Sequence, residues 1–141
     1  EGMALGQYIA GMGFSNVGLG IDHSMAHTLS AHYDTPHGVA CAMLLPIAME
    51  FNKPVVTERL AEVAKAMGVD TTGMTTDEAA IAAVKQLSAD VNIPTVCQAM
   101  KADEIDQLAT DAMNDACFPG NPREATHEDV VELFKKICPE A

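Results

Sequence analysis

Basic residues are scarce in this sequence of 141 residues, which has 8 Lys and Arg against 20 Asp and Glu. The resulting net charge of −12 repels phosphate groups, so we expect no nucleic-acid partner. Long apolar runs are also lacking. Gly, His, Asp or Asn interrupts each candidate before the roughly 18 residues that a membrane span needs. We therefore expect no membrane association either.

Cysteine is sparse and widely spaced. Cys41, Cys97, Cys117 and Cys138 form no C-x-x-C pair. Four such residues are too few for a disulfide scaffold, so we expect reduced thiols. A cationic segment followed by an apolar one, which is typical of a secretory signal, is lacking as well. Both features favour a cytoplasmic protein.

The hydrophobic pattern predicts helices throughout the chain. Hydrophobic residues make up 48% of the sequence, enough for one domain with its own core. No stretch alternates with a period of two, so we expect an all-α fold of about seven helices. The predicted helices cover residues 1–10, 22–33, 38–51, 55–67, 75–91, 103–117 and 126–137.

Several residues mark the predicted helix ends. A capping box from Thr75 to Glu78 begins one helix, and Thr126 begins the last. Asp103 is expected to cap another helix, and Gly68 to follow a helix end. The segment Asn52-Lys53-Pro54 is expected to end the third helix, because proline disrupts helical backbone.

The first twenty residues contain six glycines, which indicate close backbone approach to another helix or to a ligand. They do not form the dinucleotide fingerprint G-x-G-x-x-G, because Asn16 and His23 stand where the third glycine belongs. Residues 1–10 also start as a helix without a cap. We therefore expect the chain to be a fragment of a longer protein.

Four of the five histidines lie within fifteen residues, at positions 23, 27, 32 and 37. His23 and His27 are four residues apart and share one face of a helix. His37 follows a turn containing Pro36 that can return it to that face. Imidazoles converging in this way suit a divalent metal ion.

The histidines also fit roles that involve no metal ion. A pair spaced by four residues can arise by chance, and His32 and His127 fit surface positions. Ser24 stands where a zinc protease of the H-E-x-x-H type has its base, so that activity is excluded. Two histidines are too few for a catalytic metal. The other ligands would lie outside this chain or be Asp22 and Asp34.

The segment from Gly18 or Gly20 to Gly38, with the spacing H-x3-H-x5-Y-x2-P-H-G, resembles the second signature of the iron-dependent alcohol dehydrogenases. The resemblance extends over essentially the whole chain. It implies the all-helical, metal-binding C-terminal domain of a dehydroquinate synthase-like fold, spanning residues 1–141. The NAD(P)-binding N-terminal domain would then lie upstream.

The resemblance also implies roles for individual residues. His23 and His37 match two metal-binding histidines, and the remaining ligands, an Asp and a His, would come from upstream. His27 matches a histidine near the substrate and nicotinamide, so it is the expected catalytic residue. Phe14 and Cys117 are expected to line the substrate pocket. No cofactor-binding residue is expected within the chain.

The implied activity is oxidoreduction between small aldehydes and diols, with lactaldehyde and 1,2-propanediol as the expected pair. Fe²⁺ is the expected metal, with Zn²⁺ as an alternative, and NAD(H) or NADP(H) the expected cofactor. The full protein is expected to be a homo-oligomer. The chain alone should be inactive and should self-associate through exposed apolar surface. The alternative is a non-enzymatic helical metal-binding or interaction module.

Overall fold

A computed structural model describes residues 1–140 of the chain. Within them the secondary structure is helical and no strand occurs, which confirms the all-α prediction. Two 3-10 helices cover Ala102–Glu104 and Phe118–Gly120. The α-helices are α1 Gly2–Val17, α2 Ile21–Tyr33, α3 His37–Ala66, α4 Thr76–Asp90, α5 Ile105–Asn114 and α6 His127–Lys135.

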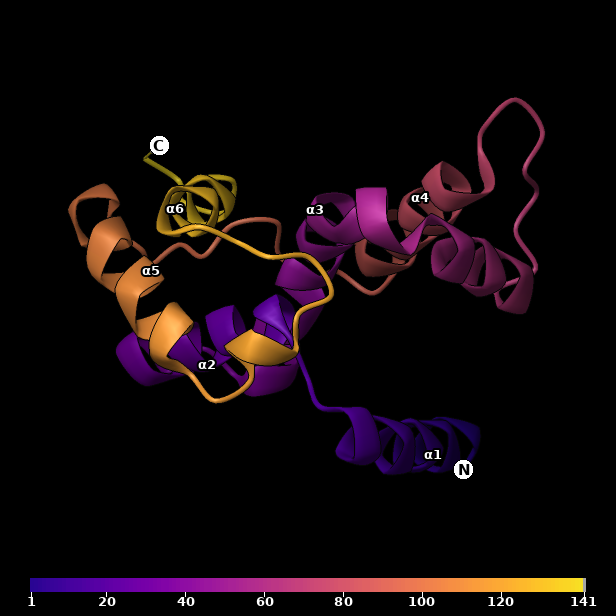
Figure 1. Cartoon of the computed structure of the whole chain (residues 1–141), viewed down its shortest axis with the longest axis horizontal. Coiled ribbons are helices and arrows are strands. Elements are labelled where there is room, and N and C mark those ends of the chain that lie inside the picture. Colours follow the sequence, from indigo (N-terminus) through magenta and orange to yellow (C-terminus); the bar gives the residue numbers. More distant parts are fainter. Residues whose placement is uncertain (141) are drawn as a thin grey trace.

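The main core lies where α2, the first half of α3, α5 and α6 pack together (Figure 1). Helices α5 and α6 each carry one strongly apolar face, and that face is buried. The fully buried side chains there include Leu29, Leu44, Leu108, Phe134 and Ile137. This core holds α2 and the start of α3 in place, and the clustered histidines lie on those two segments.

Helix α3 is interrupted close to the predicted break. The sequence analysis expects one helix to end at Asn52-Lys53-Pro54 and another to begin at residue 55. The structure has non-helical backbone at Val56, with φ −129° and ψ 19°, so two helical segments meet in a kink two residues beyond Pro54. Proline removes one backbone hydrogen bond and bends a helix. Met49 before the bend and Leu60 and Ala64 after it pack in one cluster with residues of α4.

Helix α3 also concerns the prediction that no apolar run is long enough to span a membrane. Helix α3 has a window with a mean hydropathy of 1.4, which by length and composition alone is sufficient to cross a bilayer. Seven residues of α3 are buried within the protein, where they pack on α2 and α4. A core helix of a protein also meets this criterion, so the finding is weak evidence for a membrane span.

The predicted helix starts at Thr75 and Thr126 are confirmed, and both residues form complete capping boxes. Gly68 adopts φ +67° just beyond α3, which confirms its placement after a helix end. The prediction for Asp103 is wrong. It lies in a 3-10 turn, α5 begins only at Ile105, and α5 ends at Asn114.

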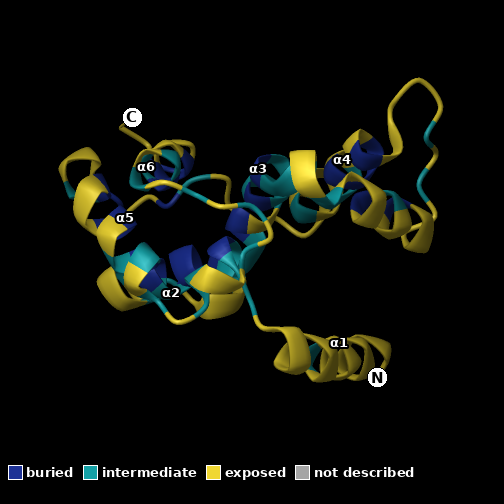
Figure 2. Cartoon of the chain, viewed as in Figure 1, coloured by how far each residue is buried: buried dark blue, intermediate teal, exposed yellow. Residues whose placement is uncertain are grey.

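Helix α1 projects from the rest of the molecule and has no buried residue (Figures 1 and 2). It extends to Val17, seven residues beyond the predicted range. A Cβ added at its glycines would meet no other element of residues 1–140 within 4 Å, so the expected approach to another helix does not occur there. It occurs instead at Gly20, where an added Cβ would lie 2.9 Å from Oδ1 of Asn121.

Candidate metal centre

The structure brings His23, His27 and His37 together. The first two project from successive turns of α2. Asp34 ends α2 with a left-handed backbone conformation at φ 52°, and Pro36 then starts α3, so His37 turns back toward α2. The ring centroid of His37 lies 5.5 Å from that of His23 and 5.2 Å from that of His27. The convergence expected from the spacing is present.

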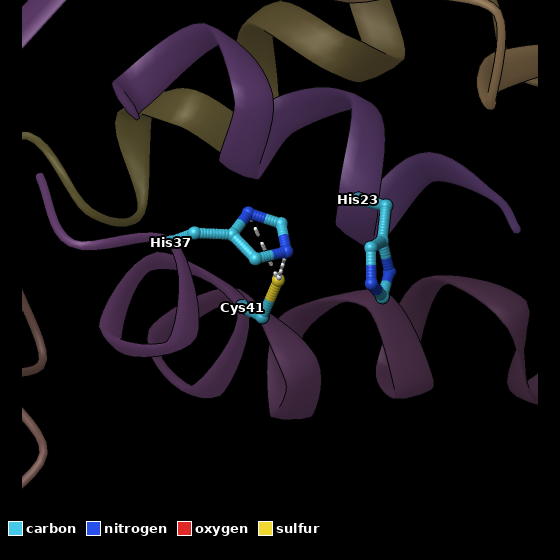
Figure 3. Close-up of side chains that lie close together, drawn as sticks. All are labelled: His23, His37 and Cys41. Atoms are coloured by element: carbon cyan, nitrogen blue, oxygen red, sulfur yellow. Dashed lines mark hydrogen bonds between the residues drawn. The ribbon is translucent and has the colours of Figure 1, made fainter. Parts of the chain in front are cut away.

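Cys41 joins this group from the second turn of α3 (Figure 3). Its Sγ lies 3.6 Å from Nε2 of His37, and donor atoms of His23, His37 and Cys41 all lie within 4.8 Å of one another. Burial raises the pKa of the thiol to about 11. The sequence analysis missed Cys41, although its spacing of four residues from His37 places both on one helix face.

The electrostatic surroundings favour neutral imidazole at His23. Burial, followed by the nearby His37 and His27, holds the pKa of His23 below its usual value, and Asp115 only partly opposes them. Neutral imidazole is the form that binds a metal ion. The donor set therefore suits a divalent cation such as Fe²⁺ or Zn²⁺.

Asp22 and Asp34, the two carboxylates considered as further metal ligands, differ in burial. Burial raises the pKa of Asp22 to about 7. Its Oδ2 lies 3.4 Å from Nδ1 of His23, and its Oδ1 has no hydrogen-bond partner among the described residues. Asp34 is exposed on the turn after α2. Neither belongs to the donor group of His23, His37 and Cys41.

His27 makes a separate contact on its other side. Its Nδ1 lies 2.9 Å from Oδ2 of Asp115, in the segment that follows α5. The backbone N–H of Cys117 donates a hydrogen bond of 2.8 Å to the other carboxylate oxygen, Oδ1. Burial opposes ionisation of Asp115, but these hydrogen bonds outweigh it and lower its pKa. The sequence analysis missed Asp115, which lies 88 residues from His27.

The two expected pocket residues, Phe14 and Cys117, have different neighbours. The ring of Phe14, on α1, has its centroid 6.2 Å from that of His23. Cys117 lies beside Asp115, and burial followed by that carboxylate raises the pKa of its thiol. His32 instead contacts Asp111, and His127 contacts Thr110, so both are surface histidines as expected.

Comparison with known proteins decides the family. Residues 1–138 match the model described as the Fe-containing alcohol dehydrogenase family, C-terminal. The chain belongs to the Fe-containing alcohol dehydrogenase family. Family membership confirms the resemblance that the histidine motif indicates.

Individual relatives agree with this assignment. Lactaldehyde reductase of Escherichia coli strain K12 is 52% identical over 95% of the chain, which covers 36% of that relative. The 1,3-propanediol dehydrogenase of Citrobacter freundii is 39% identical over 96% of the chain, again covering 36% of the relative. The chain thus spans about a third of the length of these Fe-containing alcohol dehydrogenases.

A solved structure of a related alcohol dehydrogenase has the same helical fold. An alcohol dehydrogenase from Oenococcus oeni superposes with a TM-score of 0.84 at 46% sequence identity. The match covers 91% of this chain and 35% of that structure. The helical fold described above is therefore that of part of an Fe-containing alcohol dehydrogenase.

Proposed function

We propose that the chain is the C-terminal, metal-binding domain, residues 1–141, of an oxidoreductase that interconverts small aldehydes and alcohols. Lactaldehyde and 1,2-propanediol are the proposed substrate pair. The observation that carries the proposal is the convergence of His23 and His37, whose ring centroids are 5.5 Å apart, within a family of iron-containing alcohol dehydrogenases. The higher identity to lactaldehyde reductase than to 1,3-propanediol dehydrogenase supports the substrate pair.

In this proposal His23 and His37 hold a divalent metal ion, with Fe²⁺ as the first candidate and Zn²⁺ as the second. The two imidazoles are donors that both ions accept. The family name supports iron. A metal ion bound here would supply Lewis acidity toward the carbonyl oxygen of an aldehyde. The remaining ligands, an Asp and a His, would come from outside this chain.

His27 is the proposed catalytic residue. Its ring stacks beside that of His37 at 5.2 Å between centroids, so it faces the same space without sharing the donor group. From there it can orient the substrate hydroxyl or carbonyl and pass the proton of the alcohol toward solvent. Phe14 and Cys117 would flank the reacting group.

The nicotinamide cofactor, NAD(H) or NADP(H), would be bound mainly by the part of the enzyme that precedes this chain. Hydride transfer needs cofactor, metal and substrate held together, so the chain alone is expected to lack turnover. We propose a cytoplasmic, homo-oligomeric enzyme. The sparse cysteines and the bacterial relatives support this location.

The test replaces single histidines in the full-length protein. His23→Ala should lose both the bound metal, measured by elemental analysis, and NADH-dependent reduction of lactaldehyde. His32→Ala is the matched control, because His32 lies on the same helix and contacts Asp111 instead. Wild-type turnover and metal content in the His23→Ala protein would disprove the proposed role.

A second candidate is a non-enzymatic helical module that binds a metal ion or another protein. The exposed surface of α1, which has no buried residue, favours it. The two proposals differ in the reaction catalysed by the native protein. Purified native protein that contains this chain and reduces no aldehyde with NADH or NADPH would favour the module.

A further inference from the structure

We infer that Asp115 is a positioning residue that holds the proton of His27 on Nδ1 and directs Nε2 toward the space shared with His23 and His37. The inference rests on the proposed function, in which His27 acts on the substrate. The inference adds Asp115, which lies 88 residues from His27 in the sequence, to the residues of the proposed site. Asp115 approaches His27 only because α2 and α5 pack against each other.

The contact has the geometry of a strong hydrogen bond. Nδ1 of His27 and Oδ2 of Asp115 are 2.9 Å apart, within the range for an N–H donor and a carboxylate acceptor. A carboxylate without its proton can only accept, so Nδ1 of His27 must be the donor. The proton on Nδ1 leaves Nε2 of neutral imidazole as the nitrogen with the free lone pair.

Asp115 is itself held in place. Its backbone leaves the helix at φ −70° and ψ 142°, so the side chain follows the turn rather than the helix surface. The N–H of Cys117 binds Oδ1, which leaves Oδ2 for His27. Both carboxylate oxygens therefore have partners, and rotation of the carboxylate would break two hydrogen bonds. This arrangement keeps the histidine ring in one orientation.

Two further imidazoles lie close to the ring of His27. The centroid of His37 is 5.2 Å away in a stacked arrangement, and that of His23 is 6.1 Å away. The side chain of His27 is 40% exposed and that of Asp115 is 22% exposed, so water competes only in part for this bond. A single carboxylate that accepts from one ring nitrogen is a frequent way to fix one histidine tautomer.

The chain contains a matched pair for comparison. Nε2 of His32 lies 2.8 Å from Oδ2 of Asp111, so α2 again supplies the histidine, while the carboxylate comes from within α5 rather than from the residue after it. Asp111 is more exposed than Asp115, and the His32 ring lies near Tyr33 instead of the histidine cluster. Substitutions at Asp111 therefore control for general loss of an Asp–His contact between α2 and α5.

The first experiment measures the tautomer of His27 in the chain by long-range ¹H–¹⁵N NMR correlation at neutral pH. We expect Nδ1–H in the wild type. In Asp115→Ala we expect loss of that preference, with the backbone spectrum and helicity retained. Asp111→Ala should leave the His27 signals unchanged. A wild-type Nε2–H tautomer, or an unchanged His27 tautomer in Asp115→Ala, would overturn the inference.

The second experiment separates this inference from the proposed function. In the full-length protein, Asp115→Asn should lower kcat about 10- to 100-fold at unchanged metal content, and Asp115→Glu should restore part of it. Asp111→Asn should keep wild-type kcat. Full kcat in Asp115→Asn, with His27→Ala inactive, would overturn the positioning role alone. Full kcat in His27→Ala would instead disprove the proposed catalytic role of His27.

Discussion

Gly120 allows the closest backbone approach near the candidate metal centre. A Cβ added at this position would overlap the carbonyl oxygen of Leu19, a backbone atom that cannot move aside alone. The contact joins the 3-10 helix Phe118–Gly120 to the residues just before α2. A side chain at position 120 would therefore collide with the backbone just before α2, and glycine is required there.

We predict that Gly120→Ala destabilises the chain by about 1–3 kcal/mol, the usual cost of overpacking. The measurement is urea denaturation followed by circular dichroism. Gly38→Ala is the control, because its added Cβ meets no atom within 4 Å. It should be neutral or slightly stabilising. Equal stability of Gly120→Ala and the wild type would show that this loop can shift without cost.

Cys41 leads to a second prediction at the same scale. Zinc bonds of about 2.3 Å to sulfur and 2.0 Å to nitrogen place tetrahedral S and N ligands roughly 3.5 Å apart. The Sγ–Nε2 distance of 3.6 Å between Cys41 and His37 is close to that value. Calorimetric titration of the chain with Zn²⁺ should therefore show weaker binding for Cys41→Ala than for the wild type.

The control for this titration is His127→Ala, since His127 binds Thr110 on the surface. Its zinc affinity should equal that of the wild type. Removal of the zinc with a chelator should return the wild-type chain to its starting spectrum. Identical affinities for Cys41→Ala and wild type would exclude the thiol as a ligand of the isolated chain.

The residues of the metal centre differ in how far the sequence alone could predict them. His23 and His27 share a helix face, and a short turn returns His37 to them. Local spacing was therefore sufficient to predict that these three imidazoles converge. Cys41 follows the same rule and could have been found. Asp115 could not, because its contact with His27 depends on the packing of α5 against α2. Distant pairs of this kind have no signature in a single sequence.

At the scale of secondary structure, helix starts were more predictable than helix ends. Thr75 and Thr126 satisfy backbone N–H groups through their own side chains, a local effect that the sequence displays. The break predicted at Asn52-Lys53-Pro54 lies two residues later, at Val56, where two helical segments meet in a kink. The proline in the sequence therefore indicates the interruption but not its exact residue.

The capping box of α6 leads to a third prediction. The hydrogen bonds from the backbone and side chain of Thr126 to Asp129 lower the pKa of that carboxylate, despite slight burial. A carboxylate with a lowered pKa stabilises the folded state above its unfolded pKa of 3.8, and the stabilisation is lost as pH falls through the lower, folded pKa. The cap should therefore stabilise α6 at neutral pH and not in strong acid.

We predict that Thr126→Ala lowers the free energy of unfolding by about 1 kcal/mol at pH 7. The difference from wild type should shrink as the pH falls from 3.8 through the lower, folded pKa of Asp129, below which the carboxylate is protonated in both proteins. Urea denaturation at a series of pH values measures it. The matched control is Thr57→Ala on the exposed part of α3, whose hydroxyl donates only to a backbone carbonyl and which should show no pH-dependent difference. A pH-independent difference at Thr126 would contradict the role of the carboxylate.

At the scale of the whole molecule, apolar side chains are divided unequally between the core and α1. The core cluster covers α2, α3, α5 and α6, whereas α1 carries several large apolar side chains exposed to solvent. Met3 is 87% exposed and Leu5 is 61% exposed. An exposed apolar helix of this length tends to associate with other apolar surface. The net charge of −12 opposes association between copies but lies mainly outside α1.

We therefore predict that the 141-residue chain self-associates through α1. Sedimentation velocity should show oligomers whose fraction rises with protein concentration and with salt, because salt screens the repulsion between acidic copies. The double substitution Leu5→Glu and Ile9→Glu should leave a monomer. The matched control, Leu87→Glu and Val91→Glu, alters two comparably exposed apolar residues at the end of α4 and should retain the oligomers. Monomers in both variants would mean that association needs only general surface hydrophobicity, and oligomers in both would place the contact away from α1.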